Sequence, residues 1–85
     1  MKYAVINGSK WGTIFNIGLI AKFDDLDSAK ECARQSIAED FGCRDFEEFK
    51  EDFGYDTEKE STYPLYMISR YDGDSHDEIY KVYEI

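Results

Sequence analysis

The segment Thr13–Phe41, TIFNIGLIAKFDDLDSAKECARQSIAEDF, passes from a strand pattern to a helix pattern and decides the fold. From Thr13 to Phe23 every second residue is apolar, in the order Phe15, Ile17, Leu19, Ala21 and Phe23. Because successive strand residues point to opposite faces, these side chains are expected to share one face of a sheet that needs covering on that side only. Gly18 inside the strand indicates a bulge or a close backbone approach.

A helix that begins directly after Phe23 is expected to provide this cover. Asp24 is a good N-cap, and Asp27 stands in a capping-box relation to it. Apolar residues then recur at helical spacing, at Leu26, Ala29, Ala33, Ile37 and Phe41. Gly42 suits the position just after the helix. We expect one continuous core between strand and helix, formed by Phe15, Ile17, Leu19, Phe23, Leu26, Ala33 and Ile37.

Three more strands are expected to complete the sheet. Lys2–Ile6 predicts a short strand, and Asn7-Gly8 predicts the start of a turn that runs to Gly12. Two further strands are expected at Leu65–Tyr71 and Glu78–Ile85, whereas residues 55–62 are polar and predict no element. The expected fold is α+β in the order ββααββ, a single domain of residues 1–85. An antiparallel sheet of about four strands carries one main amphipathic helix and a shorter acidic helix packed on one face.

The shorter helix lies in the most acidic stretch of the chain, Glu39–Glu60 (EDFGCRDFEEFKEDFGYDTEKE). Its ten acidic and three basic residues give a charge of −7, against −9 for the whole chain. Between about Asp45 and Phe53 the phenylalanines recur at helical spacing, so aromatic rings should face inward and carboxylates outward. We expect this acidic surface to bind a partner through Asp45, Glu47, Glu48, Glu51, Asp52, Asp56 and Glu58.

The net charge restricts the kinds of partner. A charge of −9 at pH 7 argues against direct binding to nucleic acid or to an anionic membrane, because both would repel the chain. A basic protein is the expected partner. The N-terminus lacks a signal-peptide pattern and no apolar run is long enough to span a bilayer, which predicts a cytoplasmic protein. Cys32 and Cys43 form no CxxC motif and are expected to be reduced core or boundary residues.

Enzymatic chemistry is not expected. The chain has one histidine, His76, and no recognised pairing of a nucleophile with a base. The turn around His76 offers potential metal ligands, but Gly73 and the missing glutamate at the twelfth position break the calcium-loop pattern. These potential ligands are Asp72, Asp74, His76, Asp77 and Glu78. The sequence therefore predicts no catalytic residue, no cofactor and no metal.

The order of elements resembles a known group of proteins. A short strand pair, an amphipathic helix capped just after Phe23 and a Tyr-rich final strand resemble the small acidic α+β proteins encoded by bacteriophages and mobile elements, including the anti-CRISPR inhibitors. Several of these inhibitors are similar to nucleic acid in charge and occupy a basic groove of a nuclease complex. The resemblance covers size, charge and element order. It implies a non-enzymatic inhibitor of a basic nucleic-acid-binding protein or nuclease complex, located in the bacterial host cytoplasm if phage-encoded.

A small protein-interaction or regulatory module is the alternative. Its acidity would serve only solubility, and it could be a homodimer that uses tyrosine-bearing sheet surface together with Trp11. Seven tyrosines are more than a sheet of this size can bury, and tyrosine is enriched at interfaces. Salt separates the two hypotheses, because binding through an acidic surface weakens steeply with ionic strength and apolar dimerisation does not.

Overall fold

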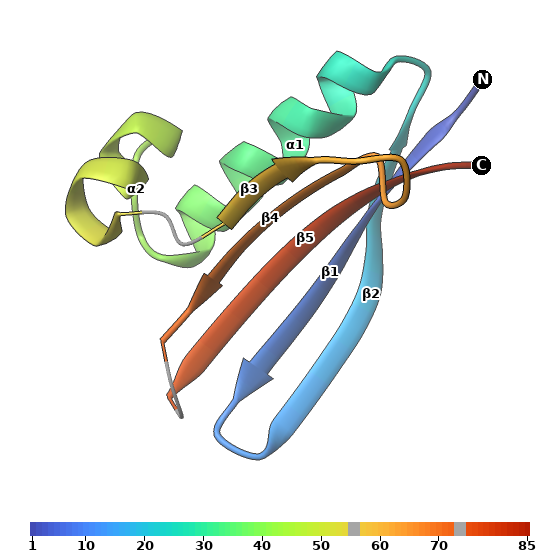
Figure 1. The fold of residues 1–85 in the computed structure, drawn as a ribbon. Coiled ribbons are helices and arrows are strands. Elements are labelled where there is room, and N and C mark those ends of the chain that lie inside the picture. The colour runs from blue at the N-terminus through green and yellow to red at the C-terminus, as the bar shows by residue number, and fades with distance from the viewer. Residues whose placement is uncertain (55–56, 73–74) are drawn as a thin grey trace.

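In a computed structural model that describes residues 1–54, 57–72 and 75–85, five strands and two helices form one α+β unit. The elements are β1 (Tyr3–Trp11), β2 (Ile14–Phe23), α1 (Leu26–Asp40), α2 (Phe46–Phe53), β3 (Thr57–Glu60), β4 (Tyr66–Tyr71) and β5 (His76–Glu84). The strands pair antiparallel in the order β2-β1-β5-β4-β3 (Figure 1). The α+β class is confirmed. The sheet has a fifth strand, β3, in the segment for which no element was predicted.

The β1–β2 hairpin is longer than predicted. β1 continues through Asn7 and Gly8, so the turn predicted there is wrong. The Asn7 side chain is held instead within the sheet, where its Nδ2 donates to Glu78 Oε2 at 2.7 Å and to the Ile79 carbonyl at 3.2 Å. The chain turns at Gly12 and Thr13, and the φ of 60° at Gly12 is the conformation that favours glycine in a two-residue hairpin.

Both helices begin at a capping aspartate. Asp25, rather than the predicted Asp24, caps α1, and its Oδ2 accepts a hydrogen bond from Ser28 N at 2.8 Å. This bond, with a second one from the Ser28 hydroxyl, lowers the pKa of Asp25. Asp45 caps α2 as predicted and accepts from Glu48 N at 2.9 Å. Gly42 follows α1 with a φ of 75°, which also agrees with the prediction.

The core lies between α1 and the central strands. Ala29, Ala33 and Ile37 of α1 are fully buried, which confirms the predicted apolar face of this helix. They belong to one cluster with Val5 on β1 and Val82 on β5. The shorter helix packs on α1 and buries its own apolar face there: Phe46 and Phe49 are buried, and the Phe49 ring lies 5.4 Å from the ring of Phe41.

The predicted contribution of β2 to this core is wrong for three of its four residues, whereas Phe23 packs against the core as predicted. Phe15, Ile17 and Leu19 are 70%, 82% and 54% exposed. Val5 pairs with Ala21 but Ile6 pairs with Leu19, so Ile20 is an extra residue that forms a bulge. Because a one-residue slip exchanges the two faces of a strand, only Ala21 and Phe23 lie on the helix side. Phe15, Ile17 and Leu19 precede the bulge and lie on the opposite side of the sheet, which we call the open face.

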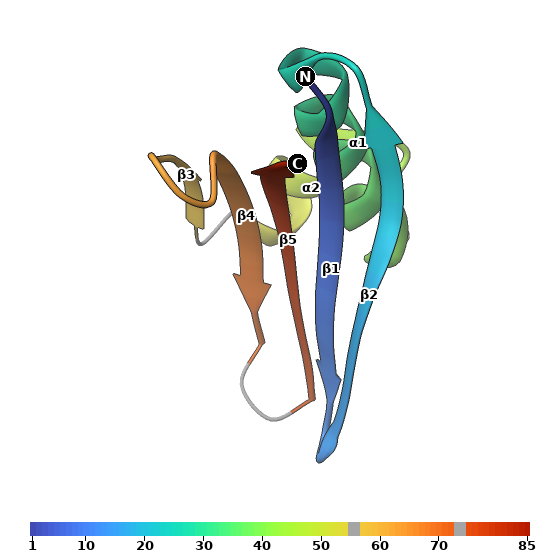
Figure 2. The same cartoon turned by 90° about the vertical axis from the view of Figure 1, so that its right-hand side faces the viewer.

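The helices cover only part of the sheet. α1 begins beside the termini and runs along the sheet, and α2 lies beyond its other end, whereas the β1–β2 hairpin extends past both helices (Figures 1 and 2). The Ile14–Leu19 half of β2 is therefore uncovered on both faces, as its burial pattern shows. Neither α1 nor α2, the two helices of the described residues, has the length and apolar content needed to cross a bilayer.

Candidate functional site

Three of the predicted acidic residues line a groove between α1, α2 and β3. Asp45, Glu47 and Glu58 share this groove of about 440 Å³ with two bases, Arg34 and Lys50. Lys50 Nζ lies 3.2 Å from Glu47 Oε1, and Arg34 Nε lies 3.4 Å from Glu58 Oε1. The groove therefore carries both signs of charge, and its acids are partly neutralised inside the molecule.

Glu58 has an internal partner besides Arg34. The Tyr66 hydroxyl donates to Glu58 Oε1 at 2.8 Å, and Tyr66 is almost completely buried under α1. Burial, with the neighbouring Glu58 carboxylate, raises the pKa of Tyr66. The Glu58 carboxylate thus satisfies a buried hydroxyl group, and it is less available to a partner than the sequence suggested.

The remaining predicted acids differ in their surroundings. Glu48 is half-buried, accepts from the backbone N–H of Arg44 at 3.3 Å and pairs with the Arg44 guanidinium at 3.4 Å. Glu51 and Asp52 are exposed on the outer side of α2 and have no ion pair among the described residues. Asp56 lies outside the described residues. The structure thus exposes two carboxylates on α2, and that of Asp52 lies within 4.8 Å of the Cys43 thiol and the Glu48 carboxylate.

A cluster of one imidazole and two carboxylates lies where the last residue of α1, the exposed Asp40, meets the first residues of β5. His76 Nε2 lies 2.8 Å from Glu78 Oε1 and 3.5 Å from Asp40 Oδ2. His76 and Glu78 are buried, and the imidazole stacks on the ring of Trp11 at 3.5 Å between centroids. Burial, with a hydrogen bond and charge repulsion from Glu78, raises the pKa of Asp40 to about 7, and His76 opposes this rise.

This cluster and a second group could each offer three ligand atoms to a metal ion. The ligand atoms of Asp40, His76 and Glu78 lie within 4.8 Å of one another, as do those of Cys43, Glu48 and Asp52. In the first group Glu78 already accepts from Asn7, and His76 already faces both carboxylates. Hydrogen bonding within the fold therefore accounts for these positions without a metal.

The turn that offered five potential ligands does not bring them together. His76 and Glu78 lie in β5 on the helix side, whereas Asp77 between them points to the open face. Asp77 Oδ1 instead accepts from the backbone N–H of Asp72 at 2.7 Å, within the turn. Asp74 lies outside the described residues. The alternation of His76 and Glu78 could have been read from the sequence, but Asp40 comes from a distant helix and could not.

The most exposed apolar surface of the described chain follows the free edge of β2. Ile14 and Ile20 are 61% and 47% exposed, and Trp11 at the hairpin end is half exposed. Together with the open-face side chains they form what we call the β2 edge surface: Trp11, Ile14, Phe15, Ile17, Leu19 and Ile20. Lys22 is the only charged residue of the strand. The sequence pattern identified these residues but assigned them to the core.

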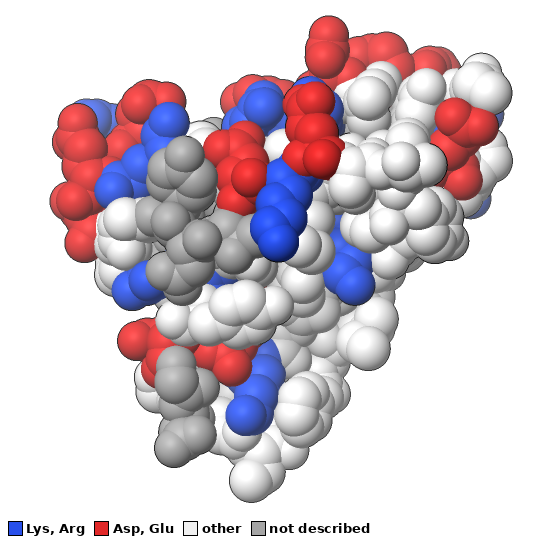
Figure 3. Space-filling view, in the orientation of Figure 1, with Lys and Arg blue, Asp and Glu red and all other residues white. Residues whose placement is uncertain are grey.

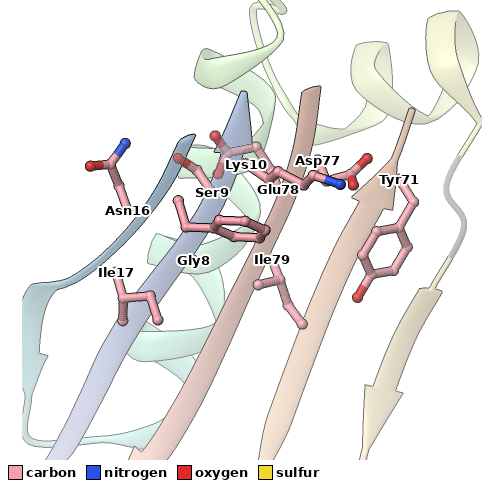
Figure 4. Close-up of a pocket in the computed structure, with 10 residues that line it drawn as sticks. Gly8, Ser9, Lys10, Asn16, Ile17, Tyr71, Asp77, Glu78 and Ile79 are labelled. Atoms are coloured by element: carbon pink, nitrogen blue, oxygen red, sulfur yellow. The ribbon is translucent and has the colours of Figure 1, made fainter. Parts of the chain in front are cut away.

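The open face next to this edge is apolar with a rim of lysines. A shallow hollow of about 240 Å³ lies over Gly8, between Ile17 of β2 and Ile79 of β5, with Tyr71 farther along (Figure 4). A Cβ at position 8 would lie 3.0 Å from the Ile79 side chain, so a larger residue there would crowd Ile79 and fill the hollow. Strand alternation places four lysines on the same face: Lys10, Lys22, Lys59 and Lys81.

Charge is segregated over the molecule. Carboxylates gather over the helices and β3, while the surface of β1 and β2 is mostly uncharged (Figure 3). The tyrosines that the structure describes form no single patch: Tyr66 and Tyr80 are buried, and the exposed Tyr63 stacks edge-on against Tyr83. The acidic surface and the apolar edge are therefore separate features.

Comparison with protein-family models, curated proteins and solved structures finds no match for the chain.

Proposed function

We propose that the protein is a non-enzymatic protein-interaction module that binds another polypeptide strand along the free edge of β2. The observation that carries this proposal is the exposure of Phe15 and Ile17, which are 70% and 82% exposed on a strand with one charged residue. Large apolar side chains gathered in this way on a surface indicate an interaction site.

The two edges of the sheet support this reading by their contrast. β3 forms one edge with four residues, Thr57–Glu60, of which three are charged. Short, charged strands are the usual protection against pairing with another chain. β2 forms the other edge with ten residues, no proline and only Lys22 charged. Its bulge at Ile20 leaves the segment from Ile14 to Leu19 regular and open to a further strand.

Strand addition uses both parts of this edge. The backbone N–H and C=O groups on the outer side of β2 can form a ladder with the added strand, since only the inner side pairs with β1. The side chains on the open face then contact the neighbouring side chains of the added strand. Affinity comes from the ladder and from burial of apolar area, and no catalytic group takes part.

A pair of matched substitutions tests the proposal. Ile17→Lys places a charge at the centre of the edge, whereas Ile85→Lys makes the same change at a position that is also 60% exposed but lies outside β2. We expect the parent to self-associate or to retain a protein from bacterial lysate, Ile17→Lys to lose that complex, and Ile85→Lys to keep it. Circular dichroism checks that both variants fold. Association that is absent, or indifferent to Ile17→Lys, would overturn the proposal.

A second candidate function uses the acidic surface. Glu51 and Asp52 are exposed without an ion pair among the described residues, and the carboxylates around them lie apart from the uncharged β2 region. We propose that this surface can occupy a basic nucleic-acid-binding site of a protein, as an inhibitor of the anti-CRISPR type would, with carboxylates in place of phosphates.

Amide substitution tests the second candidate. Changing Glu47, Glu48, Glu51 and Asp52 to their amides removes charge and keeps shape. Retention of basic proteins from lysate at low salt should fall at least about tenfold, because electrostatic attraction accelerates encounter. The matched control changes Glu31, Glu39, Asp24 and Asp27, which lie on or before α1, to amides, so that the net charge is the same. Equal loss in both variants would show a non-specific effect of charge and contradict a defined site.

A further inference from the structure

We infer that the strand added to β2 comes from a second copy of this chain, so that two copies form a symmetric dimer with one continuous sheet. This inference rests on the proposed function and names the partner for it. A dimer of this kind pairs β2 with β2 antiparallel about a two-fold axis, and each copy presents the same surface to the other. Four features of β2 support such a partner.

The first feature is a self-matching register. If Ile17 lies on the two-fold axis opposite the partner's Ile17, then Phe15 lies opposite the partner's Leu19. Residues opposite each other in an antiparallel pair share a face and interact directly. All three exposed apolar residues that β2 contributes to the open face are then paired across the axis. A shift of the axis to Asn16 or to Gly18 leaves Leu19 or Phe15 without this match.

The second feature lies on the helix side of the strand. In the same register Asn16 lies opposite the partner's Gly18, and a Cβ added at Gly18 would meet no atom within 4 Å. The space beside Gly18 can therefore receive the larger side chain. The regular pairing needs only the residues from Phe15 to Leu19, so that the bulge at Ile20 lies outside it.

The third feature is the position of charge. Lys22, the only charged residue of β2, lies opposite the turn at the partner's Gly12, so no like charges meet in the ladder. A face-to-face arrangement of two open faces would instead bring the lysine rims together, including Lys10 and Lys81, and like charges at close range disfavour that packing. In the edge arrangement the acidic helices stay on the sides away from the axis (Figure 1).

The fourth feature is the available area. Aromatic side chains can bury roughly 150–250 Å² each, and with similar values for large aliphatic ones the β2 edge surface exposes on the order of 600 Å² in total. A standard stable interface buries about 800 Å² on each partner. Together with the backbone of the edge, this surface is of the order of the area that a specific dimer at the smaller end of the range needs.

Sedimentation of the purified full chain tests for the dimer. At about 100 μM, well above the micromolar affinities that interfaces of this size reach at their weakest, the parent should sediment at twice its mass of 9.9 kDa. Ile17→Lys should sediment as a monomer, and Ile85→Lys should remain a dimer. A parent that is monomeric at this concentration overturns the inference.

Single cysteines test the register. Residues directly opposite each other lie about 4.5 or 5.5 Å apart between Cα atoms, and both distances allow a disulfide. Oxidation of Ile17→Cys should yield a covalent dimer, whereas Asn16→Cys and Leu19→Cys should yield no more than the parent with its Cys32 and Cys43. A dimer that crosslinks best through Leu19→Cys would overturn the register.

The two levels of the argument fail in different ways. If the parent is a monomer but retains another protein through Ile17, the second copy is the wrong partner and the proposed edge function stands. If the parent is a dimer that Ile17→Lys does not disrupt, both the inference and its edge are wrong. If the parent neither dimerises nor retains a protein, the proposed function falls together with the inference.

Discussion

Truncation of Ile37 measures how much the apolar face of α1 contributes to stability. The Ile37 side chain is fully buried in the cluster that includes Val5 and Val82. Ile37→Ala should lower the free energy of unfolding by about 2–4 kcal/mol, since the variant loses burial and leaves a cavity. Ile17→Ala is the matched control, because Ile17 is mostly exposed and its truncation should change little in the monomer. Urea denaturation of dilute protein measures both, and equal values would contradict the assigned core.

The raised pKa of Asp40 predicts that the free energy of unfolding decreases as the pH rises. This pKa is 3.8 in the unfolded reference and rises to about 7 in the fold, mainly through burial. The folded chain keeps a proton that the unfolded chain loses, so the stabilising contribution is complete below pH 3.8 and disappears as the pH rises through about 7. Asp40→Asn stays neutral throughout. Relative to the parent, this variant should become more stable between about pH 4 and pH 8.

The difference between the two proteins is the quantity to measure. Other carboxylates titrate in both chains, and subtracting the parent's thermal midpoint from that of Asp40→Asn at each pH removes their contribution. A difference that stays constant across this range would show that Asp40 ionises in the fold as it does in water, and would contradict the cluster with His76 and Glu78.

At the level of elements, the N-cap of α2 shows that Asp45, one of the acids expected to bind a partner, has a structural role. Asp45 accepts from Glu48 N, so Asp45→Ala should lower the free energy of unfolding by about 1 kcal/mol. Asp45→Asn removes the charge but is an equally good cap, and it should be nearly neutral. Chemical denaturation distinguishes them. A loss of stability in both variants would assign the effect to charge at the helix N-terminus instead of to the hydrogen bond.

The two helices were predictable from local rules, because caps and apolar spacing act within a few residues. α2 follows the prediction at its aspartate cap and at the buried Phe46 and Phe49, although Phe53 is 38% exposed, and α1 differs only in its capping residue. β3 was missed because its residues, Thr57–Glu60, show no apolar alternation. Its pairing with β4 forms a protected edge, a role for which charged residues are suited.

β2 shows why the position of a bulge decides a prediction. The alternation from Phe15 to Phe23 is real, but the extra residue at Ile20 transfers its first half to the other face. Gly18 drew attention to an irregularity two residues away from the actual one. The length of sheet that α1 covers is also a tertiary property, and the strand pattern does not contain it. The candidate edge could therefore be recognised only in three dimensions.

The acidic residues show the same limit. Their outward position on α2 follows from helical spacing, and Glu51 and Asp52 are placed as that spacing predicts. The partners of Glu58 could not be predicted, since Arg34 and Tyr66 come from α1 and β4. A count of carboxylates in the sequence thus overestimates the number that are free to meet another protein.

At the scale of the whole molecule, added salt should have opposite effects on dimerisation through the β2 edge and on binding through the acidic surface. Each chain carries −9, so two copies repel at long range, while the β2 edge itself has one charge per strand. Raising the salt from about 20 mM to about 500 mM shortens the Debye length from roughly 20 Å to under 5 Å and should strengthen the dimer, because it screens this repulsion. Binding of a basic protein to the acidic surface should weaken over the same range.

Sedimentation equilibrium at several salt concentrations measures this sign for the parent and for the quadruple amide variant of Glu47, Glu48, Glu51 and Asp52. Removing four negative charges from each chain should strengthen dimerisation at low salt and have little effect at high salt, since the repulsion is then already screened. A dimer that instead weakens as salt rises would be held by attraction between opposite charges. Such a dimer would place the lysine rim of one copy against the acidic helices of the other, and the β2 pairing would be wrong.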